Sequence, residues 1–101
     1  MHSSIFKVHD TMVTYLVSYD LQRPGKDYPK LHEHLRSYAE WAKPLESVWL
    51  IKSPLASEPL RDKIRAFMDG NDKILVVDVT RSTAAWYSLP QDVSDWIVKS
   101  L

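Results

Sequence analysis

The sequence predicts a single α+β domain in which helices cover one face of an antiparallel β-sheet. Stretches with the two-residue alternation of strands are interleaved with stretches in which apolar residues recur at the three- and four-residue steps of a helix. The chain has 101 residues, of which 45% are hydrophobic and 26% are charged, values typical of one folded domain rather than of a disordered chain.

The first predicted strand and helix fill residues 13–42. Side chains alternate strictly from Val13 to Asp20, which predicts a strand. A Pro-Gly loop follows, after which Asp27 is placed to cap a helix that has Pro29 in its first turn. The apolar stripe expected for this helix consists of Tyr28, Leu31, Leu35, Tyr38 and Ala42.

A hairpin and a second helix are expected next. The stretch "SVWLIKS", residues 47–53, is rich in β-favouring residues, and a brief strand at 41–45 is expected to pair with it. Ser57 is placed to cap the second helix, with Pro59 in its first turn. The buried stripe of this helix is expected to contain Leu60, Ile64, Phe67 and Met68.

The last third of the chain predicts two strands and a helix. The stretch "KILVVDV", residues 73–79, is a nearly continuous apolar run, which indicates a central strand. The stretch "AAWYS", residues 84–88, predicts a further short strand, and Pro90 opens a C-terminal helix. The side chains expected to be buried on this helix are Val93, Trp96, Ile97 and Leu101.

The elements follow the βαββαβ order of a ferredoxin-like sandwich, extended by a C-terminal strand and helix. Two helices then cover one face of the sheet, and the other face needs a cover, either a partner subunit or the C-terminal helix. Residues 12–101 form the predicted domain, whereas residues 1–11 show no periodicity and are interpreted as a flexible leader. The large side chains expected on the second sheet face are Tyr15, Trp49, Val77 and Trp86.

Composition excludes several classes of function. Thirteen basic residues balance 13 acidic ones, so the chain lacks the overall positive charge that drives nonspecific nucleic-acid binding. The absence of cysteine excludes disulfides, thiolate metal sites and cysteine nucleophiles, and it fits a cytoplasmic protein. No apolar run approaches the roughly 20 residues of a membrane-spanning helix, so we expect no membrane partner.

Asp20, at the end of the first strand, has two interpretations that the residues leave open. It is either a turn residue that caps the following loop or a carboxylate held at the sheet end for chemistry. A single carboxylate is a poor site for Mg²⁺ or Mn²⁺ unless a two-fold axis supplies a second one. In the following loop, "RPGK" contains Arg23 and Lys26, which either contact a phosphate of RNA or DNA or belong to a solvated turn.

Histidines and tryptophans give weaker indications of function. His32 and His34 are two residues apart on the predicted helix and point in different directions, unlike the pair of an HExxH zinc site. Four tryptophans in a small domain are more typical of a core or an interface than of stacking on bases.

Four stretches, "MVTYLVSYDL", "ESVWLIKS", "NDKILVVDV" and "AAW", resemble in order and spacing the small CRISPR-associated ferredoxin-fold proteins of the spacer-acquisition machinery. The likeness is closer to their stand-alone SinR-like relatives and covers roughly residues 12–88. It implies a homodimer in which the first-strand aspartates of two subunits face each other and share a divalent metal, with nuclease activity in some members. Asp20 is then the metal ligand and catalytic residue, and Ser47 and Trp49 occupy the matching positions of the second motif.

Two functions of different classes follow. The function we expect is that of a dimeric, non-catalytic module that binds a protein or a nucleic acid. The alternative is an endonuclease in which Asp20 of each subunit holds Mg²⁺ or Mn²⁺, and the cation polarises a phosphodiester of RNA or DNA and activates water. The two hypotheses separate on whether two Asp20 carboxylates reach one cation.

Overall fold

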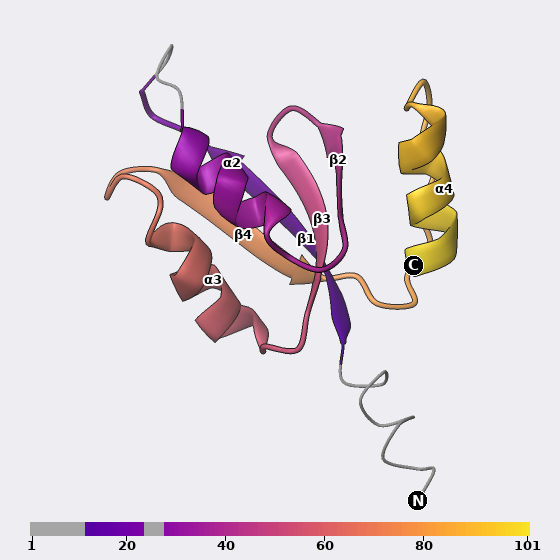
Figure 1. The fold of residues 1–101 in the computed structure, drawn as a ribbon, viewed down its shortest axis with the longest axis horizontal. Helices are drawn as coiled ribbons and strands as arrows, with labels where there is room; N and C mark the ends of the chain where they lie inside the picture. Colours follow the sequence, from indigo (N-terminus) through magenta and orange to yellow (C-terminus); the bar gives the residue numbers. More distant parts are fainter. Residues whose placement is uncertain (1–11, 24–27) are drawn as a thin grey trace, which may run out of the picture.

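The computed structural model describes residues 12–23 and 28–101. The predicted leader at residues 1–11, Lys26 and the predicted helix cap Asp27 lie outside the described residues. In chain order, the elements are β1 (Val13–Asp20), α2 (Pro29–Arg36), β2 (Trp41–Leu45), β3 (Val48–Ser53), α3 (Ser57–Arg65), β4 (Lys73–Asp78) and α4 (Gln91–Ser100) (Figure 1).

The four strands form one antiparallel sheet in the order β2-β3-β1-β4, which confirms the predicted α+β class with an antiparallel sheet. β1 is an inner strand with both edges paired, because Val17 lies opposite Trp49 of β3 on one side and opposite Val76 of β4 on the other. The predicted hairpin between β2 and β3 is confirmed, with Trp41 opposite Ile51.

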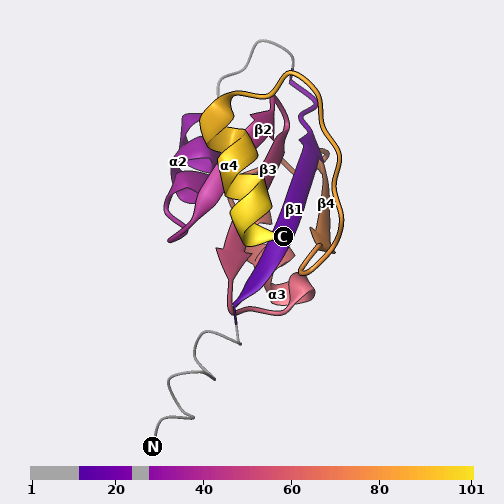
Figure 2. The same ribbon diagram turned by 90° about the vertical axis from the view of Figure 1, so that its right-hand side faces the viewer.

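Helices lie on both faces of the sheet. α2 and α3 cover one face, here called the inner face, whereas α4 lies against the opposite, outer face (Figures 1 and 2). The main core lies between the inner face and these two helices, and the alternate β1 residues Tyr15, Val17 and Tyr19 belong to it. The other buried members of this core are Tyr28, Leu31, Leu35, Trp49, Ile51, Leu60 and Ile64.

Two of the large side chains expected on the second sheet face lie on the inner face instead. Tyr15 and Trp49 are 3% and 0% exposed in the core under α2 and α3. Val77 does lie on the outer face, since it is paired with Leu16, whereas Trp86 lies in the loop after β4. The prediction was wrong because alternation separates the two faces of a strand without indicating which face receives the helices.

The first helix ends earlier than the sequence predicts. α2 ends at Arg36, so Tyr38 lies beyond it and Ala42 belongs to β2. Ser37 closes the helix, because its backbone N–H and its hydroxyl both donate to the carbonyl of His34. These local hydrogen bonds of Ser37 end the helix before it reaches Tyr38 and Ala42 of the predicted apolar stripe.

The second helix is also shorter than predicted, and its cap differs. Ser57 is the first helical residue, and Ala56, which has no side-chain acceptor, occupies the N-cap position. Phe67 and Met68 follow the end of α3 at Arg65, and their N–H groups donate to carbonyls three residues earlier, the tighter geometry with which helices often end. Met68 still packs against the core, whereas Phe67 is exposed.

The apolar run at residues 73–79 is not the central strand that the sequence predicts. It forms β4, Lys73–Asp78, at the edge of the sheet, with β1 as its neighbour. Leu75 is 60% exposed and Val77 is 39% exposed on the outer face. A run of apolar residues indicates a strand, but it does not indicate whether both of its edges are paired.

The C-terminal extension contains the predicted helix but not the predicted strand. Residues 84–88 are irregular, and Ser88 adopts a φ value of 63°, in the left-handed region rather than in the extended region of a strand. On α4, Ile97 is buried as expected, whereas Val93, Trp96 and Leu101 are half-buried. Among the described residues, no helix combines the length and the hydrophobicity needed to cross a bilayer.

Candidate functional site

Asp20 is the last residue of β1, and its side chain is exposed on the outer face. In the sheet register it lies directly opposite Lys73, the first residue of β4. Directly opposite residues in an antiparallel pair have Cβ atoms about 5 Å apart. The cross-strand neighbour of this carboxylate is therefore an ammonium group rather than a second carboxylate.

The residues around Asp20 do not fit a divalent cation by themselves. The described part of the chain contains no group of three or more His, Asp or Glu residues placed to hold a metal ion. Mg²⁺ prefers six oxygen ligands in octahedral geometry, of which one or two are usually carboxylates, and a neighbouring lysine opposes the binding of a cation. A metal site at Asp20 therefore requires a carboxylate from another copy of the chain.

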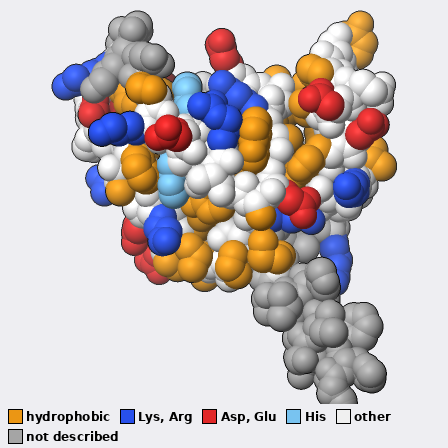
Figure 3. Space-filling view, in the orientation of Figure 1, with side chains coloured by type: hydrophobic (Ala, Val, Ile, Leu, Met, Phe, Trp, Pro, Cys, Tyr) orange, Lys and Arg blue, Asp and Glu red, His pale blue; other side chains and the backbone are white. Residues whose placement is uncertain are grey.

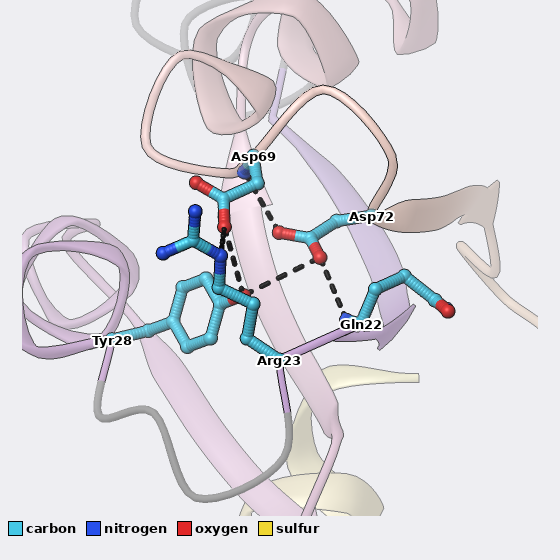
Figure 4. A network of polar contacts seen from close by, with 5 residues as sticks. All are labelled: Gln22, Arg23, Tyr28, Asp69 and Asp72. Carbon is cyan, nitrogen blue, oxygen red and sulfur yellow. Dashed lines mark hydrogen bonds and ion pairs between the residues drawn. The ribbon is translucent and has the colours of Figure 1, made fainter.

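A network of polar contacts lies near the end of β1, around the turn before β4 (Figure 4). Asp72, which is 9% exposed, is its centre. One carboxylate oxygen accepts the N–H of Gln22 at 2.8 Å and the hydroxyl of Tyr28 at 3.4 Å, and the other accepts the N–H of Asp69 at 2.7 Å. The network ties the loop after β1 and the start of α2 to the turn before β4.

Burial and negative charge act together on the hydroxyl of Tyr28. This side chain is buried, and it also donates to a carboxylate oxygen of Asp69 at 3.4 Å. Burial, followed by the negative charges of Asp72 and Asp69, raises the pKa of Tyr28 above its ordinary value. The hydroxyl therefore remains a hydrogen-bond donor at neutral pH, which suits a structural role.

Arg23 belongs to the same network. Its Nε lies 3.0 Å from a carboxylate oxygen of Asp69, and its side chain is 60% exposed. The phosphate contact predicted for Arg23 and Lys26 stays a prediction, and Lys26 lies outside the described residues. An arginine that already has an acid partner has fewer free donors for a phosphate.

Trp49, which occupies a position matched by the family resemblance, is a core residue. Its indole N–H donates to the hydroxyl of Tyr19 at 3.0 Å, and Trp41 packs against it with ring centroids 5.4 Å apart. Burial raises the pKa of Tyr19, and the bond from Trp49 acts in the opposite direction. Ser47, the other matching position, accepts the backbone N–H of Tyr19 through its carbonyl at 3.2 Å.

The two histidines of α2 have different neighbours. The ring of His32 lies 6.0 Å from the ring of Trp49, whereas the ring of His34 stacks on Phe67 at 4.5 Å. The Nε2 atom of His34 is also 2.9 Å from the hydroxyl of Tyr38. Both histidines therefore have aromatic neighbours. Burial, followed by the positive charge of Lys63, lowers the pKa of His34.

The outer edge of β4 is the feature that sequence reasoning missed. No described residue pairs with this edge, and a groove of about 420 Å³ runs between it and α3. The groove is lined by Ser57, Glu58, Arg61, Ile74, Leu75 and Val76. Backbone groups of an edge strand are a template for another strand, so this surface is a candidate binding site.

Comparisons of the chain with protein-family models, with curated proteins and with solved structures found no match.

Proposed function

We propose that the chain is a ferredoxin-like, non-catalytic binding module that forms a homodimer by pairing the outer edge of β4 with the same edge of a second copy. The ferredoxin-like assignment is supported by the βαββαβ order of the first six elements and by the position of β1 between β3 and β4. The exposed edge of β4 is the observation that carries the proposed function. The absence of cysteine from the chain fits a cytoplasmic location.

The two edge strands of the sheet differ in how well they are protected. β2 contains Lys43 and Pro44, and its pairing with β3 is irregular between Ala42 and Leu45, all features that discourage a further strand. β4 has the sequence "KILVVD", in which four apolar residues stand between the two charged ends. The edge of β4 is therefore the one open to strand addition.

A second copy suits this edge because an antiparallel pair of identical strands has two-fold symmetry. Side chains that lie opposite each other in such a pair point to the same face, so Leu75 and Val77 of both copies form one apolar surface. The formal net charge of zero gives no overall repulsion between two copies. Pairing covers exposed apolar surface and supplies partners to unpaired backbone groups.

The same geometry bears on the alternative of a shared metal. In a dimer paired through β4, the two Asp20 residues are separated by three strand spacings of about 4.8 Å, which is at least about 14 Å. A cation with oxygen ligands at about 2.1 Å does not bridge that distance. The paired dimer therefore favours binding over cation-dependent cleavage.

Charge distribution favours a protein partner over a nucleic acid. Acidic and basic side chains are interspersed over the side of the molecule seen in Figure 3, without one continuous basic field. Arg23 is paired with Asp69. Nucleic-acid affinity depends largely on neutralising several phosphates, which needs a cluster of unpaired basic groups.

Analytical ultracentrifugation at tens of micromolar tests the dimer. We expect the wild type to sediment at twice the 11.7 kDa mass of the chain, and L75K to sediment as a folded monomer. L45K is the matched control, because Leu45 is 59% exposed on the other edge strand and Leu75 is 60% exposed. A monomeric wild type at tens of micromolar, or equal dissociation by both variants, would refute pairing through β4.

Asp20→Asn separates binding from catalysis, because it keeps the shape of the side chain and removes its charge. We expect D20N to retain the dimer and its melting temperature. Cleavage of single-stranded RNA or DNA that requires Mg²⁺ or Mn²⁺ and is lost in D20N would overturn the non-catalytic function.

A further inference from the structure

A cavity of about 380 Å³ lies on the outer face of the sheet, beside α4, and has no lining residue in β4. Three parts of the chain enclose it: the outer face of the sheet, one side of α4 and the segment of residues 79–89, here called the arch. The lining residues are Leu16, Pro44, Leu45, Val48, Leu50, Val79, Ser82, Thr83, Ala84, Ala85, Trp86, Tyr87, Leu89, Ile97 and Leu101.

Hydrogen bonds fix the arch and α4 to the rest of the fold. The indole N–H of Trp86 donates to the hydroxyl of Ser94 at 2.9 Å, which joins the arch to α4. Thr14 of β1 bonds to the start of the arch and to the end of α4. Its N–H donates to the hydroxyl of Thr80 at 3.0 Å, and its hydroxyl donates to the carbonyl of Ser100 at 3.2 Å. The cavity is therefore enclosed by anchored elements rather than by a loose loop.

The backbone of the arch is bent at two defined places. Arg81 and Ser88 have φ values of 57° and 63°, although neither is glycine. Such conformations persist only where the surrounding structure holds them. Between the two bends, Ala84 and Ala85, with their small side chains, line the cavity without filling it.

None of the side chains that line the cavity carries a charge, and most are apolar. Its volume lies in the range of small-molecule sites, at about 300–1,000 Å³, and it is smaller than one turn of a helix about 11 Å wide, which occupies roughly 500 Å³. We infer that the cavity binds a small, uncharged and mainly apolar molecule. The hydroxyls of Ser82, Thr83 and Tyr87 are polar groups of lining residues that are available to orient it.

Side chains at the edge of the cavity are consistent with this ligand. Tyr87 is 91% exposed, Leu45 is 59% exposed and Trp86 is 38% exposed, and all three line the cavity. An uncharged apolar molecule removes water from these surfaces on binding, whereas a charged molecule loses its hydration without gaining a partner.

Fluorescence titration with N-phenyl-1-naphthylamine, an uncharged aromatic probe, tests the inference on the full chain. We expect a saturable rise in probe fluorescence with one site per chain. A85F should weaken binding at least tenfold, because a phenyl group at this position occupies the cavity. A66F is the matched control, since Ala66 is exposed at the end of α3, and it should leave the affinity unchanged.

Two further variants make the result decisive. If circular dichroism shows that A85F is unfolded, A84F fills the cavity from the neighbouring position and takes its place. L75K should bind the probe with wild-type affinity, which keeps this inference separate from pairing through β4. Failure of the wild type to show saturable binding, equal affinity in A85F or A84F, or loss of binding in L75K would each overturn the assignment.

Discussion

Replacing Asp72 by Asn tests whether this carboxylate holds the loop after β1. Asn keeps one acceptor oxygen, which satisfies the N–H of Gln22 and the hydroxyl of Tyr28. Its amide NH₂ then faces the N–H of Asp69, so a bond of 2.7 Å becomes a contact between two donors. Since Asp72 is only 9% exposed, an unmade bond of this kind costs about 2 kcal/mol.

Replacing the same residue by Ala removes the three hydrogen bonds that its carboxylate accepts from Gln22, Tyr28 and Asp69. The hydroxyl of Tyr28 retains Asp69 as an acceptor, but the N–H groups of Gln22 and Asp69 lose the carboxylate. We therefore expect Asp72→Ala to lower the free energy of unfolding by about 3–4 kcal/mol. In a domain of this size, the 2 kcal/mol expected for D72N corresponds to a fall in melting temperature of about 10 °C.

Urea unfolding followed by circular dichroism measures both losses. D69N is the matched control, because Asn keeps an acceptor oxygen for the hydroxyl of Tyr28 and weakens the ion pair with Arg23. The side chains of Asp69 and Arg23 are 30% and 60% exposed, and exposed pairs contribute about 0–1 kcal/mol. The m-values should stay equal to that of the wild type. If D72N is no more destabilising than D69N, Asp72 is not the centre of the network.

Two further predictions concern the inner face. Burial, followed by the charge of Lys63, lowers the pKa of His34, so its imidazole binds a proton less readily in the folded state than in the unfolded chain. The contribution of His34 to the free energy of unfolding is therefore retained above about pH 6.5 and is lost as the pH falls from 6.5 through the folded pKa. H34Q should flatten this fall in thermal melts, and an unchanged pH profile would contradict the assignment. Trp49→Phe removes the hydrogen bond to Tyr19 and leaves a void in the core. Chemical denaturation should therefore show a fall of about 2 kcal/mol in the free energy of unfolding. A variant as stable as the wild type would contradict the place of Trp49 in the core.

The four strands of the sheet and the hairpin could be predicted because their signal is local, whereas the strand expected at residues 84–88 does not form. Strict alternation from Val13 to Asp20 fixes which β1 side chains share a face, and the buried apolar residues Tyr15, Val17 and Tyr19 follow that alternation. The hairpin of β2 and β3 joins segments that are adjacent in sequence. Such features depend on neighbouring residues, which the sequence presents directly.

The polar network around Asp72 could not be predicted because its contacts are distant in sequence. Gln22 and Tyr28 meet Asp72 across separations of 50 and 44 residues. The stretch "DGND" indicates a turn, and its two aspartates show no sign of the partners that the fold supplies. Asp20, in contrast, could be placed at a strand end, but its neighbour Lys73 emerges only from the register of β1 with β4.

The position of α4 accounts for both surfaces that we assign to binding. The helix lies over the β2 side of the outer face and joins the arch in enclosing the cavity, whose sheet residues belong to β1, β2 and β3 (Figure 2). On the outer face of β4, Leu75 is 60% exposed. A helix shifted towards β4 would bury this leucine and remove the apolar surface available to a second copy. The arch, which leaves the sheet after Asp78 and returns on the β2 side, therefore determines that one half of the outer face encloses a cavity while the other half remains open to a partner.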